Sequence, residues 1–136
     1  MTTSTPASPA PSKLALRIGY GLSGFAALFL VFDASIKLLG QPEALEGTRQ
    51  LGYPTGIVFE LGVLQLALLI LYLIPRSAVV GAVLWTGYLG GAVATHVRVE
   101  APLFSHVLFP IYVAAMLWIG LALRDRRVRA LVDAQP

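Results

Sequence analysis

The sequence predicts an all-α fold, an integral membrane four-helix antiparallel bundle. Of the 136 residues, 57% are hydrophobic, without counting the 13 glycines, and only 12% are charged, whereas a soluble domain carries about 25% charged residues. The mean hydropathy of +0.76 indicates lipid rather than water as the main solvent. The apolar residues form four unbroken runs of about 20, long enough to cross a bilayer as helices and without the alternation of barrel strands.

The chain begins with residues 1–12, which contain only Met, Thr, Ser, Pro and Ala. Such a segment buries too little apolar surface to offset the entropy of ordering, so we interpret it as a disordered N-terminal tail. The first predicted helix covers about 14–39 and has an uncharged core from Ile18 to Phe32. A cleaved signal peptide is the alternative interpretation, but no small-x-small cleavage site follows at the expected place.

The second and third predicted helices cover about 57–74 and about 78–97. Pro54 precedes the second helix and Pro75 follows it directly, and proline is disfavoured inside a helix, which explains both boundaries. Only a few residues connect the two helices, so we expect them to be antiparallel neighbours.

The fourth predicted helix covers about 103–123, with Pro102 at its start and Pro110 inside it. Because proline removes a helical hydrogen bond, Pro110 is expected to kink this helix. The four helices form one transmembrane domain, 13–124, followed by a basic tail at 125–136.

Glycines are placed where helix backbones could approach one another. Gly87 and Gly91 form a G-x-x-x-G spacing in the third helix, and Gly19, Gly21 and Gly24 lie near the start of the first. The G-x-x-x-G spacing is typical either of a contact within the chain or of a homo-oligomer interface.

The ten Lys and Arg residues divide between the two ends of the bundle. One end carries Lys13, Arg17, Arg76, Arg124, Arg126, Arg127 and Arg129, and the other carries Lys37, Arg49 and Arg98. The positive-inside rule therefore places both termini in the cytoplasm, and we expect a multi-pass protein of the bacterial cytoplasmic (inner) membrane. The basic tail is expected to fix this topology, or to attract anionic headgroups. Since the basic residues lie at segment ends, the net charge of +3 does not indicate nucleic-acid binding.

Ionisable residues from all four helices converge on the end opposite the termini. This layer contains Asp33, Lys37, Glu60, His96, Arg98 and His106. An isolated charge is costly in lipid, and ionisable residues within spans often mark functional sites. The layer therefore predicts a polar cavity that opens to the outer face.

Asp33 and Lys37 are four residues apart, so they can pair on one helix face. The pair is interpreted either as a neutralised pair near the interface or as the lining of a cavity with Glu60. Glu60 has no basic residue at i+3 or i+4, so it finds a partner on another segment or is protonated. Gln65 lies about 140° from Glu60 around the helix and is expected to face another neighbour, as a helix-packing residue.

His96 and His106 suggest chemistry near neutral pH, such as a proton relay or donation to a quinone carbonyl. No H-x-x-x-H or E-x-x-H spacing is present, so no metal site is predicted. The absence of cysteine excludes disulfides, thiolate metal sites and thiol–disulfide chemistry. No cofactor motif is evident, and a quinone is the one cofactor that this layer suggests.

Several short motifs occur in an order that resembles the DoxX-like family of small bacterial membrane proteins. They are Phe32 to Leu39, the run Leu51-Gly52-Tyr53-Pro54 leading to Glu60-Leu61-Gly62, Ile74-Pro75-Arg76, Gly87 to Ala92, and Thr95-His96. The resemblance covers about residues 17–124. It implies a four-helix membrane bundle and suggests roles for Lys37, Tyr53 with Pro54, Glu60 and His96.

The family's namesake is a small subunit of a thiosulfate:quinone oxidoreductase, and relatives are associated with redox or detoxification systems. Fold alone does not transfer that activity. The resemblance favours a non-catalytic component of a membrane redox or stress-related complex, with a membrane or redox protein as its partner besides the lipid bilayer. One alternative is a quinone-like ligand site with Asp33, Lys37, Tyr53, Glu60, His96, Arg98 and His106 as candidates. A second alternative is an oligomeric proton-coupled transporter.

Overall fold

The computed structural model describes residue 4 and residues 9–134. Its elements are α1 (Lys13–Leu38), α2 (Pro42–Gln50), η1 (Thr55–Ile57), α3 (Val58–Leu73), α4 (Ala78–Arg98), η2 (Leu103–Val107), α5 (Phe109–Arg124) and α6 (Arg126–Asp133). The described part of the chain contains no strand. Most of the predicted tail at 1–12 lies outside the described residues.

Four segments are long and apolar enough to cross a membrane: Lys13–Leu38, Thr55–Leu73, Ala78–Arg98 and Leu103–Arg124. Large apolar side chains on their outer faces remain exposed, including Phe25 and Leu28 at 65% and 74%. In water such a surface would be unfavourable, whereas in a bilayer it contacts lipid tails. The predicted fold class, an all-α membrane bundle, is confirmed.

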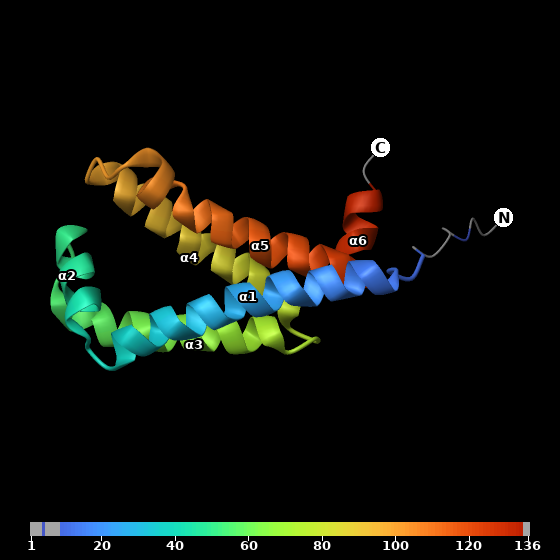
Figure 1. Ribbon diagram of the computed structural model, residues 1–136, viewed down its shortest axis with the longest axis horizontal. Helices are drawn as coiled ribbons and strands as arrows, with labels where there is room; N and C mark the ends of the chain where they lie inside the picture. Colours follow the sequence, from blue (N-terminus) through green and yellow to red (C-terminus); the bar gives the residue numbers. More distant parts are fainter. Residues whose placement is uncertain (1–3, 5–8, 135–136) are drawn as a thin grey trace.

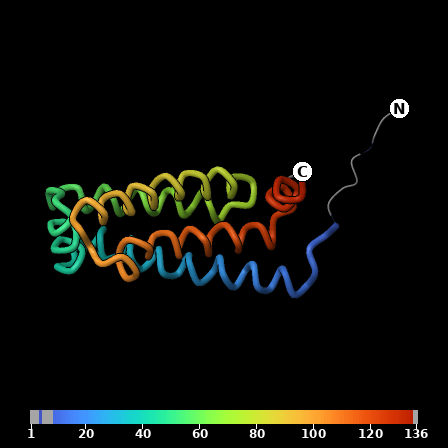
Figure 2. Tube along the Cα trace, turned by 90° about the horizontal axis from the view of Figure 1, so that it is seen from above, coloured from blue at the N-terminus to red at the C-terminus, as the bar shows by residue number. Residues whose placement is uncertain are grey.

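The four long segments pack around a shared core. α1 contacts α3 and α5, and α4 contacts the same two helices. Successive segments run in opposite directions, so both termini lie at one end of the bundle and α2 lies at the other (Figures 1 and 2). Towards the α2 end, α4 and α5 diverge from α1 and α3 (Figure 1).

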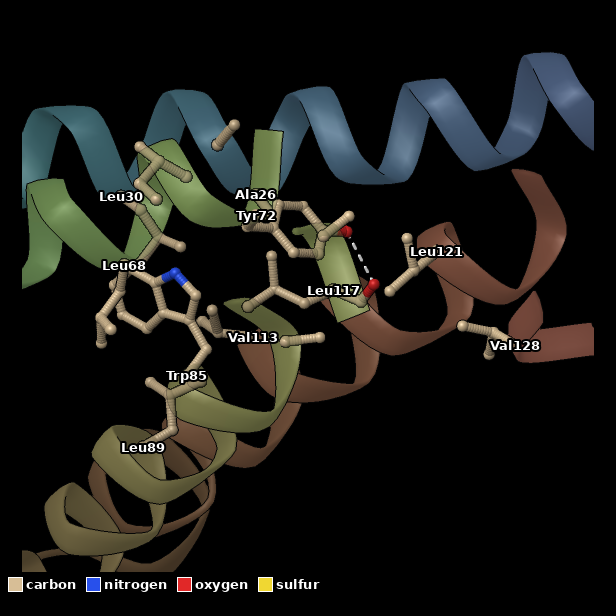
Figure 3. Packing of buried hydrophobic residues seen from close by; sticks show 14 residues of the cluster. Ala26, Leu30, Leu68, Tyr72, Trp85, Leu89, Val113, Leu117, Leu121 and Val128 are labelled. Carbon is tan, nitrogen blue, oxygen red and sulfur yellow. Dashed lines mark hydrogen bonds between the residues drawn. The ribbon is translucent and has the colours of Figure 1, made fainter. Parts of the chain in front are cut away.

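The centre of the core contains two large aromatic side chains, Tyr72 of α3 and Trp85 of α4, both fully buried. Leu117 of α5 and Leu30 of α1 lie beside them, so each long helix contributes to one cluster (Figure 3). The Tyr72 hydroxyl donates a hydrogen bond to the Leu117 carbonyl at 2.7 Å, which satisfies a polar group that would otherwise be costly to bury.

Several glycines allow the helices to approach closely. A Cβ added at Gly81 would lie 2.5 Å from the backbone nitrogen of Tyr72, and one added at Gly120 would lie 2.5 Å from Ser23 Oγ. The predicted crowding near the start of α1 involves Gly19, which faces Gly120, whereas Gly21 has open space around its Cβ position.

The G-x-x-x-G pair of α4 makes no such approach. A Cβ at Gly87 or at Gly91 would meet nothing within 4 Å. Of the two interpretations of this spacing, a contact within the chain is therefore wrong, and a homo-oligomer interface stays a prediction.

The segments that connect the predicted spans contain helical turns that the apolar runs did not predict. Within residues 40–56, α2 starts at Pro42, whose fixed φ suits the first helical turn. The fourth span is divided into the π-turn η2 and α5, and Pro110 stands in the first turn of α5. Pro110 therefore begins a helix instead of kinking one, because the first turn needs no amide hydrogen from it.

Candidate functional site

Two adjoining cavities occupy the α2 end of the bundle. The first, which we call the polar cavity, has a volume of about 580 Å³, and the second, the lateral cavity, has a volume of about 500 Å³. Both volumes fall in the range of small-molecule sites. Residues that line both are Asp33, Lys37, Thr48, Leu51 and His96. The two cavities therefore meet at a polar junction.

The cavities differ in the chemistry of their remaining walls. The polar cavity is lined by the end of α1, by α2 and by the segment around η2, with Glu43, Glu100 and His106 among its residues. The lateral cavity extends between the long helices and is lined mainly by apolar side chains, such as Phe29 and Leu64. A polar space thus continues into an apolar one.

Asp33 is the centre of the junction. Its Oδ2 accepts from Lys37 Nζ, the i,i+4 pair that the spacing predicts, and from Gln65 Nε2 at 2.7 Å. The side chains of Lys37 and Asp33 are 15% and 27% exposed. Because Lys37 neutralises Asp33 and Gln65 holds it from a second helix, the carboxylate is stabilised at the cavity wall. The pair is thus both neutralised and part of a cavity lining.

The two histidines lie on facing segments, with ring centroids 6.0 Å apart. His96 Nδ1 is 2.8 Å from the Ala92 carbonyl, and a carbonyl only accepts, so Nδ1 carries the proton and Nε2 of a neutral ring is an acceptor. His106 Nδ1 bonds Ser105 Oγ at 2.7 Å, and His106 is exposed. Among the described residues, no third His, Cys, Asp or Glu joins them in a metal-binding group.

Arg98 and Tyr53 are brought together at the edge of the site. An Arg98 amino group donates to the Leu51 carbonyl at 2.8 Å, and its guanidinium lies 5.9 Å from the Tyr53 ring centroid. Tyr53 lines the lateral cavity, and its hydroxyl is 3.3 Å from Thr95 Oγ1, which itself donates to the Gly91 carbonyl. Arg98 is thus placed to hold the loop that forms this wall.

Glu60 is the predicted candidate that the structure keeps apart from the others. Its side chain is exposed, and it is not among the residues that line either cavity. The expected lining of one cavity by Glu60 and the Asp33–Lys37 pair is therefore wrong. Gln65, five residues along α3, is 3% exposed and faces the junction instead. It lies on the buried stripe of α3 with Val58, Gly62, Leu69 and Tyr72.

Sequence reasoning missed three further features of the site. Gln65 was expected to be a packing residue, although an amide in an apolar run was a signal for a buried polar contact. Thr48 and the rest of α2 gave little signal, because the segment is short and polar. Glu100, two residues beyond the end of α4, has a positive φ of 55°, a conformation unfavourable by about 1–2 kcal/mol for a residue with a Cβ, and it lines the polar cavity.

Comparison with known proteins supports the family resemblance that the sequence motifs suggested. The model of the DoxX-like family matches residues 21–120, a range that reaches from α1 to α5. Comparison with curated proteins and with solved structures gives no match. The match covers most of the chain and includes the residues at the junction of the cavities. With four segments able to cross a membrane, this multi-pass membrane protein belongs to the DoxX-like family.

Proposed function

We propose that the protein binds a small amphiphilic molecule of quinone-like size at the α2 end of the bundle. The observation that carries this proposal is that the polar and lateral cavities meet at Asp33, Lys37 and His96. A molecule with a polar head and an apolar body matches such a site, because each part finds walls of its own polarity.

The polar head has charged and hydrogen-bonding groups available at the junction. Lys37 has more N–H groups than its bond to Asp33 uses, and His96 Nε2 accepts. The apolar body would contact Phe29 and Phe109, whose rings pack edge to face with centroids 5.3 Å apart. Burial of the body supplies affinity and the junction supplies orientation.

We further propose that this end faces outwards from a bacterial cytoplasmic membrane. The turn between α3 and α4, which contains Arg76, and α6, which begins with Arg126 and Arg127, lie at the opposite end with the termini (Figure 1). The positive-inside rule requires such basic residues on a cytoplasmic face. The ligand would then reach the polar cavity from the outer surface or from the outer leaflet.

The test is binding by the purified full-length protein in lipid nanodiscs. Isothermal titration calorimetry with a decyl-substituted benzoquinone and its hydroquinone is expected to show saturable binding of at least one of them. Asp33→Asn and His96→Ala are expected to weaken that binding by about tenfold or more, the effect of losing one hydrogen bond to a charged or buried group.

Glu60→Gln is the matched control, since Glu60 is exposed outside both cavities. It is expected to bind as the parent does. If neither compound binds, or if Asp33→Asn and His96→Ala bind as tightly as Glu60→Gln, the proposal is wrong.

The other two hypotheses stay predictions from the sequence. A non-catalytic component of a redox or stress-related complex would retain a reproducible protein partner in a pull-down from mild detergent. A proton-coupled transporter would produce a flux into proteoliposomes above that of empty vesicles.

A further inference from the structure

The last helix, α6, carries an apolar face of which the bundle covers only the first part. Val128 is 4% exposed and belongs to the core cluster, beside Leu121 of α5 (Figure 3). Leu131 and Val132, one turn further along, are 66% and 62% exposed. At 100° per residue, the three side chains of α6 lie within an arc of about 100°. Two large apolar side chains therefore continue the buried face of α6 beyond the edge of the bundle.

The direction of α6 turns this face towards the membrane. The fourth membrane-crossing segment ends at Arg124 and α6 begins at Arg126, so α6 lies at the membrane boundary. It runs across the long axis of the bundle in Figure 1 and is seen end-on in Figure 2, and it is therefore parallel to the membrane surface. Leu121 lies within the membrane-crossing segment, so the face of α6 that joins Val128 to it points at the apolar layer.

Hydrogen bonds to two neighbouring segments fix the direction of α6. The Arg127 guanidinium donates to the carbonyls of Pro75 and Arg76, in the turn between α3 and α4. An Arg129 amino group donates to the Leu123 carbonyl of α5 at 3.2 Å. The direction of the helix therefore does not depend on what covers its apolar face.

The remaining surface of α6 is basic. Arg126 is exposed and lies about 160° from Val128 around the helix, and Arg129 lies about 100° from it. Among the described residues, neither arginine belongs to an ion pair. Arg76, in the turn that Arg127 contacts, is exposed as well. An apolar face flanked by basic residues is typical of a helix that lies in the interface of a membrane containing anionic lipids.

We propose that α6 lies in the headgroup layer of the membrane surface on the side of the termini and binds anionic phospholipids there. Leu131 and Val132 reach between the acyl chains, since the apolar faces of interfacial helices are buried to about 5–10 Å. The guanidinium groups of Arg126, Arg129 and Arg76 donate to phosphate oxygens, whose charge they complement. This contact is separate from the ligand site at the α2 end and does not depend on it.

A second copy of the chain is a less favourable cover for this face. Two copies that met through Leu131 and Val132 would also bring Arg126 and Arg129 of each copy together, and like charges repel. Two side chains on a helix of 8 residues also bury far less than the roughly 1,000 Å² of a specific interface. A lipid surface has neither disadvantage, because its apolar and anionic layers match the two faces of α6.

The test measures the depth of single spin labels on α6, which a chain without cysteine permits. Leu131→Cys, Val132→Cys and, on the opposite exposed face, Ala130→Cys are labelled in the full-length protein. The nanodiscs contain equal amounts of phosphatidylglycerol and phosphatidylcholine. Power saturation compares collisions with oxygen, which concentrates in lipid, and with a water-soluble nickel chelate. The ratio of oxygen to nickel collisions is expected to be higher by about threefold or more at positions 131 and 132 than at position 130.

The role of charge is tested with the label at Val132→Cys. Replacing phosphatidylglycerol by phosphatidylcholine is expected to lower the collision ratio by about twofold or more, because the attraction to the basic face is lost. Arg76→Gln combined with Arg126→Gln is expected to lower it similarly in the anionic nanodiscs. Among the described residues, neither of these side chains has a hydrogen-bond partner, so the double variant changes charge alone. Arg49→Gln, at an exposed position of α2, is the matched control and is expected to keep the parent ratio.

Three other outcomes would contradict the proposal. Ratios at positions 131 and 132 equal to that at position 130 would mean that α6 lies in water. Few collisions with either reagent, together with dipolar broadening between labels, would mean that a second copy covers the face. Ratios unaffected by phosphatidylglycerol and by the two arginines would refute the binding of anionic lipids. The comparison of the two lipid compositions needs no charge variant, so poor folding of the double variant does not remove the test.

Discussion

Tyr72 illustrates how a polar atom is accommodated in an apolar membrane core. Its hydroxyl donates to Leu117 O at 2.7 Å, so it accepts the hydrogen bond that joins it to Ser23 Oγ at 2.9 Å. Ser23 in turn accepts from Arg124 Nε at 3.1 Å, and the Arg124 guanidinium lies 5.3 Å from the Tyr72 ring centroid. These bonds connect α1, α3 and α5 near the end that carries the termini.

Replacing Tyr72 by phenylalanine is expected to lower the free energy of unfolding by about 1–3 kcal/mol, because it leaves the buried Ser23 O–H without its acceptor and removes the side-chain hydrogen bond to the Leu117 carbonyl. Equilibrium unfolding in mixed detergent micelles measures the change. Tyr112→Phe is the matched control, since Tyr112 is 46% exposed. Equal losses in the two variants would contradict the role of the Tyr72 hydroxyl.

Asp125 caps the N-terminus of α6, and its ionisation makes the attachment of this helix depend on pH. It accepts from the backbone nitrogen of Arg127 at 2.8 Å and pairs with its guanidinium, which also bonds the Pro75 carbonyl beyond α3. The hydrogen bond from the Arg127 side chain lowers the pKa of Asp125. Because folding lowers the pKa of Asp125, its carboxylate stabilises the attachment of α6 fully at pH values above the unfolded-state pKa of about 3.9. This stabilisation is lost as the pH falls through the lower pKa of the folded state.

The mobility of α6 is therefore expected to rise as the pH falls below about 4. Because the chain has no cysteine, a single spin label at Ala130→Cys reports this mobility by electron paramagnetic resonance. In a background of Asp125→Asn the label is expected to be mobile already at neutral pH. A label whose mobility is the same in both backgrounds at every pH would refute the assignment.

At the level of helices, packing depends on close backbone approach at specific positions. The turn between α3 and α4 is short, and Ser77 Oγ donates across it to the Leu71 carbonyl at 2.8 Å. The Cβ position of Gly81 lies 2.7 Å from Tyr72 Cα, so a larger residue would have to displace backbone. In contrast, a Cβ at Gly90 in the same helix meets nothing within 4 Å.

Gly81→Ala is expected to destabilise the fold by about 1–3 kcal/mol, because backbone cannot move aside as a flexible side chain can. Gly90→Ala is expected to be neutral or to stabilise by up to about 1 kcal/mol, since alanine favours helix. Thermal unfolding in detergent compares the two. A similar midpoint for both variants would show that the close contact at Gly81 is not required.

For the molecule as a whole, the uneven charge at its two ends predicts its orientation in the membrane. The α3–α4 turn, which contains Arg76, and α6, which begins with Arg126 and Arg127, lie with the termini, and α2 lies at the far end (Figure 1). In intact bacterial cells, a membrane-impermeant maleimide is expected to label Glu43→Cys on α2. Ala134→Cys is expected to react only after permeabilisation. The reverse pattern would contradict cytoplasmic termini.

The sequence alone was sufficient to predict the features that depend on residues close to one another in the chain. Unbroken apolar runs and the prolines between them indicated where the spans begin and end, and i,i+4 spacing predicted the Asp33–Lys37 pair. The convergence of polar residues at one end also followed from the alternating direction of the helices. Segments of low hydropathy, α2 and α6, were not recognised because their short helices depend on packing against the bundle.

Only the tertiary structure decided which residues face the cavities. In a lipid-embedded helix both the core side and the lipid side are apolar, so hydrophobic periodicity does not distinguish them. For this reason Glu60 was expected at the site and Gln65 elsewhere, whereas Gln65 bonds Asp33 and Glu60 is exposed. The contact joins residues 32 positions apart in sequence, and it exists because α1 and α3 pack side by side.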